Sequence, residues 1–222
     1  MFVINMNKAP AISYSIACWL TLLSLASLNC LASDQIMVGD TVSTPQDINA
    51  LDIPLLSETG STVTINSFKA PVRLVFFGFT YCPDICPLTL HKVASALRLI
   101  DRPAADVDVI FISVDPKRDT PEILTQYTNA FHEQITGLIG NVDQLQAITK
   151  YFRTTFGYNL LTSDGDQPLP LNEYHAIPAN STYTPYHSSQ VYLLNLNNDI
   201  VDLIGLGSDI KLIAQTIENA FN

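Results

Sequence analysis

The hydrophobic positions of this chain form long apolar runs separated by short polar segments. Residues 72–79 are almost entirely apolar and rich in valine and phenylalanine, the pattern of a strand that is buried on both faces. From Pro87 the apolar positions recur at helical spacing until Arg102-Pro103, which would end a helix. Residues 106–114 are a second apolar run. A strand, a helix and a strand in this order predict a right-handed parallel crossover.

Local patterns predict the remaining elements. Thr120 followed by Pro121 is typical of a helix start, with threonine as the N-cap and proline at the first helical position. Asn197-Asn198-Asp199 separates two apolar runs, as in an antiparallel hairpin. In addition to the elements above, the sequence predicts a hairpin over 51–55 and 62–65, a helix from 121 to about 131, a helix from 142 to 156, a hairpin over 191–196 and 200–206, and an amphipathic helix over 209–221.

Residues 159–186 show no regular spacing of apolar positions and contain four prolines. Structureless connections of this length are uncommon inside a compact domain, and they usually serve as lids or binding loops. We therefore expect a long loop that ends just before His187 and precedes the final hairpin. Three of its tyrosines, Tyr174, Tyr183 and Tyr186, are candidates to shield a site.

The length and hydrophobicity of the chain favour one domain behind a leader. The 222 residues are 47% hydrophobic, enough for a single substantial core. An uncharged apolar run over residues 11–28 precedes Cys30-Leu31-Ala32, which fits cleavage of a secretory signal after Ala32, while a run of this length could also stay as an anchor. We expect a signal peptide or membrane anchor over 1–32, an extended lead-in over 33–50 and the folded domain over 51–222. Such a protein is exported to the periplasm or held at the outer face of the inner membrane.

The net charge and the positions of the cysteines limit the classes of function that the chain can have. A net charge of −10, from 21 acidic and 11 basic residues, excludes a nucleic-acid binder and favours cationic partners or metal ions. Cys18 and Cys30 belong to the leader, so Cys82 and Cys86 are the cysteines of the domain. A pair four positions apart closes a small loop and stabilises a fold little through chain entropy. We therefore expect the two cysteines to take part in redox chemistry or metal binding rather than to form a stabilising disulfide.

Cys82 and Cys86 follow the first apolar run, where the chain must turn from the central strand into a helix. Open α/β sheets place their sites at the carboxyl ends of strands. A helix N-terminus stabilises the thiolate, the form that attacks disulfides and binds metals. The i, i+4 spacing places the two side chains over one another, which suits chelation of a metal ion and still permits a disulfide.

His187 is the best candidate for a third ligand, because it stands where the expected loop meets the strand of the final hairpin. Two thiolates and one imidazole suit Cu(I) and can also hold Cu(II), while zinc would accept the same set with a water molecule. The ligands alone do not decide between the metals. His91, His132 and His175 are expected to be packed or solvated side chains.

Three acidic residues lie near the same end of the sheet. Asp84 stands between the cysteines, and Asp115 and Asp119 follow the second apolar run. We expect all three to satisfy backbone N–H groups at turns and helix starts. For Asp84 the alternative is electrostatic tuning of the site, and for Asp115 and Asp119 it is a contact behind the ligands or a docking role.

These segments resemble the signatures of the Sco (SenC-type) proteins, copper-delivery factors for the binuclear copper centre of cytochrome c oxidase. Residues 77–87 are similar to the first signature almost residue for residue, residues 112–122 resemble the second, and residues 136–140 a weaker third. The resemblance covers roughly residues 40–220. It implies an α/β, thioredoxin-like fold related to peroxiredoxins, a mixed sheet flanked by helices, and copper bound by Cys82, Cys86 and His187.

The resemblance also implies a metallochaperone rather than an enzyme. Its partner would be the copper-bearing subunit of the oxidase, with another copper chaperone or a thiol reductant as further candidates, and it would act close to the membrane if the leader is retained. The family usually has an aspartate before its ligand histidine, whereas Tyr186 stands there in this chain. This difference concerns the orientation of His187 or the docking of a partner more than ligation.

Two other functions would use the same cysteines. A thiol-disulfide oxidoreductase acting on the oxidase subunit or on other exported proteins needs only Cys82 and Cys86. A thiol peroxidase would need an arginine beside its reactive cysteine, and the sequence does not place Arg73, Arg118 or Arg153 there. The peroxidase is therefore the least favoured of the three functions.

Overall fold

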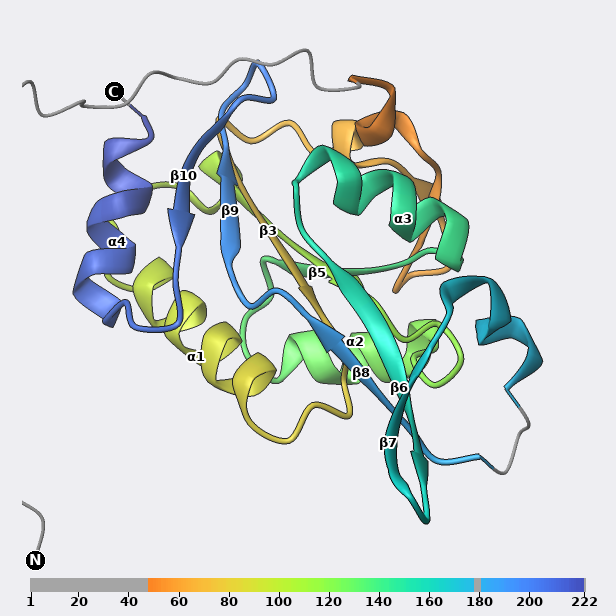
Figure 1. The fold of residues 1–222 in the computed structure, drawn as a ribbon. Helices are drawn as coiled ribbons and strands as arrows, with labels where there is room; N and C mark the ends of the chain where they lie inside the picture. The colour runs from red at the N-terminus through yellow and green to blue at the C-terminus, as the bar shows by residue number, and fades with distance from the viewer. Residues whose placement is uncertain (1–47, 178–180, 222) are drawn as a thin grey trace, which may run out of the picture. The chain divides into compact units, whose positions relative to one another are not determined.

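The computed structural model describes residues 48–177 and 181–221, which lie in a compact unit spanning Ser43–Asn222 (Figure 1). The expected leader over 1–32 and the lead-in up to residue 47 fall outside the described residues. The end of the lead-in forms the short 3-10 helix η1 (Ile48–Asp52). Within the described ranges, no helix has the length and apolar character needed to cross a bilayer.

A seven-stranded mixed sheet forms the centre of the domain, in the order β10-β9-β3-β4-β5-β1-β2. β3 pairs in parallel with β4, and β4 with β5, while β9 pairs antiparallel with β3. The parallel pairing expected between the two apolar runs is confirmed, as is the final hairpin. The first hairpin forms over 55–57 and 62–63 rather than 51–55 and 62–65, because Leu51 and Asp52 belong to a 3-10 helix. The strands are β1 (Leu55–Ser57), β2 (Thr62–Val63), β3 (Val72–Gly78), β4 (Val107–Ser113), β5 (Ile135–Ile139), β9 (Val191–Leu194) and β10 (Ile200–Ile204).

The central strand β3 divides the core into two layers. All seven of its residues are buried, and alternate side chains point to opposite faces of the sheet. Val75 and Phe77 join one hydrophobic cluster, which includes residues of α3. Leu74 and Phe76 join the other, which includes residues of α1, α2 and α4. The four helices are α1 (Ile85–Leu97), α2 (Pro121–Asn129), α3 (Val142–Tyr151) and α4 (Ile210–Asn219), and α1 and α4 lie side by side in Figure 1.

The observed helix bounds follow from caps and buried faces. The Thr120 side chain accepts a hydrogen bond from the backbone N–H of Ile123, as expected of the N-cap of α2. Helix α1 begins at Ile85 rather than Pro87, so its buried face is set by Cys86, Leu90, Val93 and Leu97. Leu88 lies off that face and is 45% exposed.

The segment over residues 159–186 is not a long loop, so that expectation was wrong. Most of it belongs to a second, antiparallel sheet in the order β7-β6-β8, with β6 (Phe156–Thr162), β7 (Gly165–Leu169) and β8 (Tyr183–His187). A 3-10 helix, η4 (Leu171–Ala176), connects toward β8. Pro168 and Pro185 fit because they lie in the two edge strands, where a missing N–H is tolerated. The helix expected to reach residue 156 ends at Tyr151, because Phe156 already begins β6.

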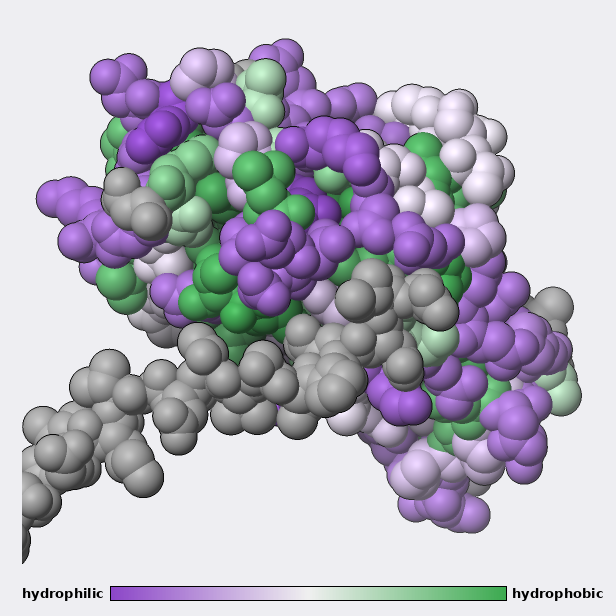
Figure 2. All heavy atoms as spheres, turned by 90° about the horizontal axis from the view of Figure 1, so that it is seen from above, coloured by the Kyte–Doolittle hydropathy of each residue, from purple (hydrophilic) through white to green (hydrophobic). Residues whose placement is uncertain are grey.

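The surface combines hydrophilic side chains with smaller hydrophobic areas, as the view from above shows (Figure 2). Some large apolar side chains are exposed close to the cysteines, namely Tyr81 at 60%, Leu88 at 45% and Ile85 at 36%. Scattered apolar side chains are ordinary on a protein surface. These three matter because they surround the start of α1.

We predict that Gly78→Ala lowers the free energy of unfolding by about 1–3 kcal/mol. A Cβ atom at Gly78 would stand 2.6 Å from Cε2 of Phe111 and 3.0 Å from Sγ of Cys86, so the packed core would have to move. Gly205→Ala is the matched control, because no atom lies within 4 Å of its added Cβ. Urea denaturation of both variants measures the difference, and equal midpoints would show that the core adapts without cost.

Candidate functional site

The two cysteines lie where β3 leads into α1. Cys82 belongs to the connecting loop and is partly exposed, whereas Cys86 is the second residue of α1 and is fully buried. Both are free thiols. The Cys86 sulfur packs beside Gly78, where any larger residue would displace it. One sulfur therefore faces the surface and the other lies in the core.

The start of α1 makes Cys82 the reactive member of the pair. A hydrogen bond from the Cys86 thiol lowers the pKa of Cys82 to about 5, and backbone groups of residues 84–86 act in the same direction against the effect of burial. The pKa of Cys86 is raised, first because this thiol gives its hydrogen bond to Cys82 and then because it is buried. The two shifts run in opposite directions, so Cys82 is the member of the pair that favours the thiolate and Cys86 the member that keeps its proton.

β8 brings His187 to this pair. His187 is the last residue of the strand, and its Nε2 lies 3.4 Å from Sγ of Cys86. Its Nδ1 lies 2.8 Å from the carbonyl oxygen of Ser188. Because a carbonyl only accepts, Nδ1 carries a proton in this contact, and Nε2 is the ring atom that faces the sulfur.

Two aromatic rings orient the imidazole of His187. Phe76 and Phe79 meet it edge to face, each with ring centroids 5.9 Å away. Both phenylalanines belong to β3 or follow it directly, so the strand that leads to Cys82 also packs against the histidine. The sequence analysis placed these rings in the core but did not anticipate this contact.

The structure therefore brings together residues that the sequence singled out. Cys86 Sγ contacts His187 Nε2, and Cys82 precedes Cys86 by four residues in the loop that leads into α1. Within residues 48–177 and 181–221, no group of three or more His, Cys, Asp or Glu side chains is already arranged to hold a metal ion. The other histidines lie elsewhere: His91 and His175 are exposed on α1 and η4, and His132 accepts a hydrogen bond from the backbone of Gln134.

Asp119 fixes the loop that carries Cys82. Its carboxylate accepts hydrogen bonds from the N–H and hydroxyl of Thr80, at 3.2 and 2.6 Å, and from the hydroxyl of Ser113 at 2.5 Å. Burial raises the pKa of Asp119, while these hydrogen bonds oppose the shift. Asp119 does not cap α2, because Thr120 does, and the backbone N–H that Asp119 satisfies is that of Thr80. Asp84 stands at the N-cap of α1 but makes no side-chain capping bond.

Asp115 holds the segment that carries His187. The carboxylate is fully buried, forms an ion pair with Arg118 and accepts hydrogen bonds from Tyr183 at 2.6 Å and Tyr174 at 3.3 Å. These contacts fasten η4 and β8 to the end of β4. Tyr174 and Tyr183 were expected to shield the site, and instead they bind this carboxylate. No spacing rule in the sequence pairs residues 115 and 183, which are 68 positions apart.

Tyr186, in place of the family's usual aspartate, is 49% exposed. It pairs with Gly157 across β6 and β8, and its ring occupies the space that a Cβ of Gly157 would need. Glycine allows this close approach of an aromatic ring on the neighbouring strand. The tyrosine therefore covers the outer side of β6 beside His187.

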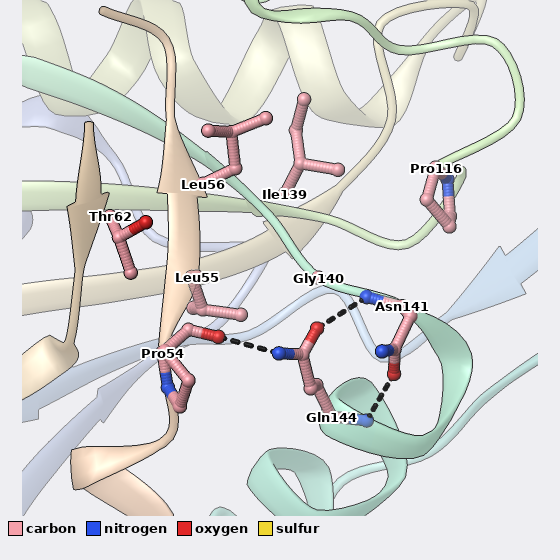
Figure 3. A pocket seen from close by; sticks show the side chains of 9 residues that line it. All are labelled: Pro54, Leu55, Leu56, Thr62, Pro116, Ile139, Gly140, Asn141 and Gln144. Atoms are coloured by element: carbon pink, nitrogen blue, oxygen red, sulfur yellow. Dashed lines mark hydrogen bonds between the residues drawn. The ribbon is translucent and has the colours of Figure 1, made fainter. Parts of the chain in front are cut away.

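A cavity of about 420 Å³ lies between β1 and the start of α3, away from the cysteines (Figure 3). The side chain of Gln144 spans it, donating to the carbonyl of Pro54 and accepting from the N–H of Asn141, both at 2.7 Å. No cysteine, histidine or acidic residue is among its lining residues. The thiol–imidazole cluster is therefore the better candidate site.

Comparisons with known proteins identify the family and the fold of this chain. A family model described as SCO1/SenC matches residues 46–222. An SCO2-like protein of Rickettsia felis is 32% identical over 167 residues, which cover 75% of this chain and 74% of that protein. ScoI of Arabidopsis thaliana with copper bound is 27% identical with a TM-score of 0.62, covering 76% of this chain and 94% of that one. Yeast Sco1 with copper bound is 28% identical with a TM-score of 0.62, covering 75% and 84%. The thioredoxin-like fold expected from the sequence is confirmed.

We predict that Cys86→Ala slows alkylation of Cys82 by iodoacetamide at pH 6 by at least about tenfold. Without the Cys86 donor, the pKa of Cys82 returns toward its usual value, so less thiolate exists at that pH. The measurement uses chains in which Cys18 and Cys30 are serine. At pH 10 both proteins carry the thiolate, and their rates should converge. Equal rates at pH 6 would contradict the assigned hydrogen bond.

Proposed function

Because this chain belongs to the SCO1/SenC family, we propose that it binds copper through Cys82, Cys86 and His187 and delivers it to the binuclear copper centre of cytochrome c oxidase. The observation that carries the proposal is the 3.4 Å approach of His187 Nε2 to Cys86 Sγ. It places an imidazole nitrogen beside a thiol pair whose outer member, Cys82, has a lowered pKa. This makes the protein a metallochaperone rather than an enzyme.

The donor set suits copper. Bonds of about 2.0 Å to nitrogen and about 2.3 Å to sulfur, with the two atoms 3.4 Å apart, subtend a roughly tetrahedral angle at the metal. Cys82, in the loop four residues before Cys86, is the third ligand in this proposal. Thiolates favour Cu(I), and the imidazole makes Cu(II) acceptable as well. The copper-bound relatives from Arabidopsis and yeast support copper over zinc.

The different exposure of the two cysteines supports release of copper by ligand exchange. Cys86 is buried and held in α1, whereas Cys82 is partly exposed in the loop. An incoming thiolate of the oxidase subunit can therefore replace Cys82 first. Copper would reach this site from another copper chaperone, with a thiol reductant keeping the cysteines reduced.

We further propose that the protein works outside the cytoplasm, in the periplasm or at the outer face of the inner membrane. The apolar segment over residues 11–28 supports export, with residues 1–32 as a signal peptide or an anchor. Residues 33–50 would then lead to the domain over 51–222. Both forms would keep the thiol pair accessible to an oxidase subunit in the same compartment.

We predict that the reduced protein, with serine in place of Cys18 and Cys30, binds one tight equivalent of Cu(I). His187→Ala should weaken the affinity at least about tenfold, because one of three ligands is lost. His175→Ala is the matched control, since that side chain is exposed on η4. Anaerobic titration against a competing chelator measures all three proteins. Undiminished affinity in His187→Ala would remove the histidine from the site.

The low pKa of Cys82 favours a second candidate function, thiol-disulfide exchange with the oxidase subunit or with other exported proteins. This activity needs the two cysteines but not the imidazole. We predict that reduction of insulin disulfides, if it is the main activity, is abolished in Cys82→Ser and retained in His187→Ala. Loss of activity in both variants would contradict a function that needs the cysteines alone.

A further inference from the structure

We infer that a cavity beside Cys82, between the loop and α2, receives the residues that flank the reactive cysteine of a partner protein, with an apolar or aromatic side chain seated against Tyr127. This inference rests on the proposed function, because both copper transfer and thiol exchange bring a partner's sulfur to Cys82. To the proposed function it adds which residues of the partner are recognised, those beside its cysteine, and which surface of this protein recognises them, the cavity beside Cys82.

The position of the cavity links it to the thiol pair. Its volume is about 440 Å³, and its walls come from the loop and from one side of α2. Tyr81, in the loop wall, is bonded directly to Cys82 in the chain. Neighbouring residues of an extended peptide lie within about 3.3–3.6 Å per residue along the chain, so a residue adjacent to a partner's cysteine falls within reach. The lining residues are Thr80, Tyr81, Ile123, Gln126, Tyr127 and Ala130.

The lining suits an apolar side chain with its backbone. None of the lining residues carries a charge, and two of them are aromatic. Small-ligand and peptide sites typically combine such apolar walls with a few polar groups, at volumes of about 300–1,000 Å³. Thr80 and Gln126 supply polar groups at the rim. An apolar or aromatic residue beside the partner's cysteine therefore fits better than a charged one.

Tyr127 adds an unsatisfied group. Its hydroxyl is buried and has no hydrogen-bond partner among the described residues. A buried hydroxyl without a partner is costly, so a shift of the Tyr127 ring that brought the hydroxyl to a partner's carbonyl oxygen would gain a hydrogen bond. Burial raises the pKa of Tyr127, and the charges of Cys86 and Cys82 add to the shift, which indicates that the hydroxyl lies near the thiol pair.

The exposed apolar side chains around Cys82 extend the same surface. Tyr81 is 60% exposed, and Ile85 and Leu88 are exposed on the first turns of α1. The guanidinium carbon of Arg118 lies 5.4 Å from the centre of the Tyr81 ring, a contact that favours one orientation of that ring. A partner bound at Cys82 would cover an aromatic residue that is otherwise left in water.

The test compares two peptides whose cysteine is joined to 2-nitro-5-thiobenzoate, Gly-Phe-Cys-Phe-Gly and Gly-Gly-Cys-Gly-Gly. The Cys82 thiolate attacks the peptide sulfur, the new disulfide joins Cys82 to the peptide, and the coloured thiobenzoate leaves with the electron pair of the broken bond. The full-length chain carries serine at positions 18 and 30. We expect the phenylalanine peptide to react about tenfold faster.

Ala130→Trp fills the cavity and should abolish this preference, which is measured as the ratio of the rates of the two peptides. Asn129→Trp is the matched control, because it adds the same ring at the neighbouring exposed position, outside the lining. Gln126→Trp is a second blocking variant should Ala130→Trp fold poorly. The preference should survive in the control and disappear in both blocking variants.

Three outcomes would overturn the inference. Equal rates for the two peptides, or a preference that persists in both blocking variants, would show that the cavity does not recognise the residues beside the partner's cysteine. The preference for the phenylalanine peptide could instead vary with protein concentration, and sedimentation could show a dimer that the Ala130→Trp variant no longer forms. This pair of results would assign the cavity to a second copy of the chain. The Cu(I) titration of Ala130→Trp separates these results from the proposed function, because blocking the cavity should leave copper affinity intact.

Discussion

Two buried carboxylates at the end of β4 hold the two halves of the site together. Asp119 binds Thr80, two residues before Cys82, and Asp115 binds Tyr183, four residues before His187. Both acids lie in one short turn, at 2% and 0% exposure. The loop with the thiols and the strand with the imidazole are therefore positioned by a common anchor, although they come from distant parts of the chain.

Asp115 and Asp119 can stay buried because each carboxylate is compensated by a different set of partners. Asp115 is paired with Arg118 and receives two tyrosine hydroxyls, whereas Asp119 relies on neutral donors from Ser113 and Thr80. A buried charge without such partners would be strongly unfavourable. Arg118 also lies over the ring of Tyr183, 4.3 Å from its centre. The same side chain thus contacts both halves of the site, through Tyr81 and through Tyr183.

The elements that the sequence predicted are those with a strong local signal. β3 is a continuous apolar run, and the start of α2 has a cap and a proline, so both were recognised. The second sheet was missed because the residues of β7 are almost all exposed, which leaves no alternation of apolar and polar positions to read. Pro185 also argued against a strand, because only the edge position of β8 makes it acceptable. The candidate ligands were found through residue type and spacing, but the contacts of Asp119 with Thr80 and of His187 with Phe76 depend on tertiary folding.

The distance along the chain between the cysteines and the histidine links the site to folding. Cys82 and Cys86 are neighbours even in an unfolded chain, whereas 101 positions separate Cys86 from His187. Closing a loop of that length costs entropy that only the folded domain repays. A metal ion bound by all three side chains would therefore bind the native state more tightly than the unfolded one and stabilise it by mass action. A nascent or damaged chain would offer copper the two thiols alone, so the complete site is itself a mark of a correctly folded protein.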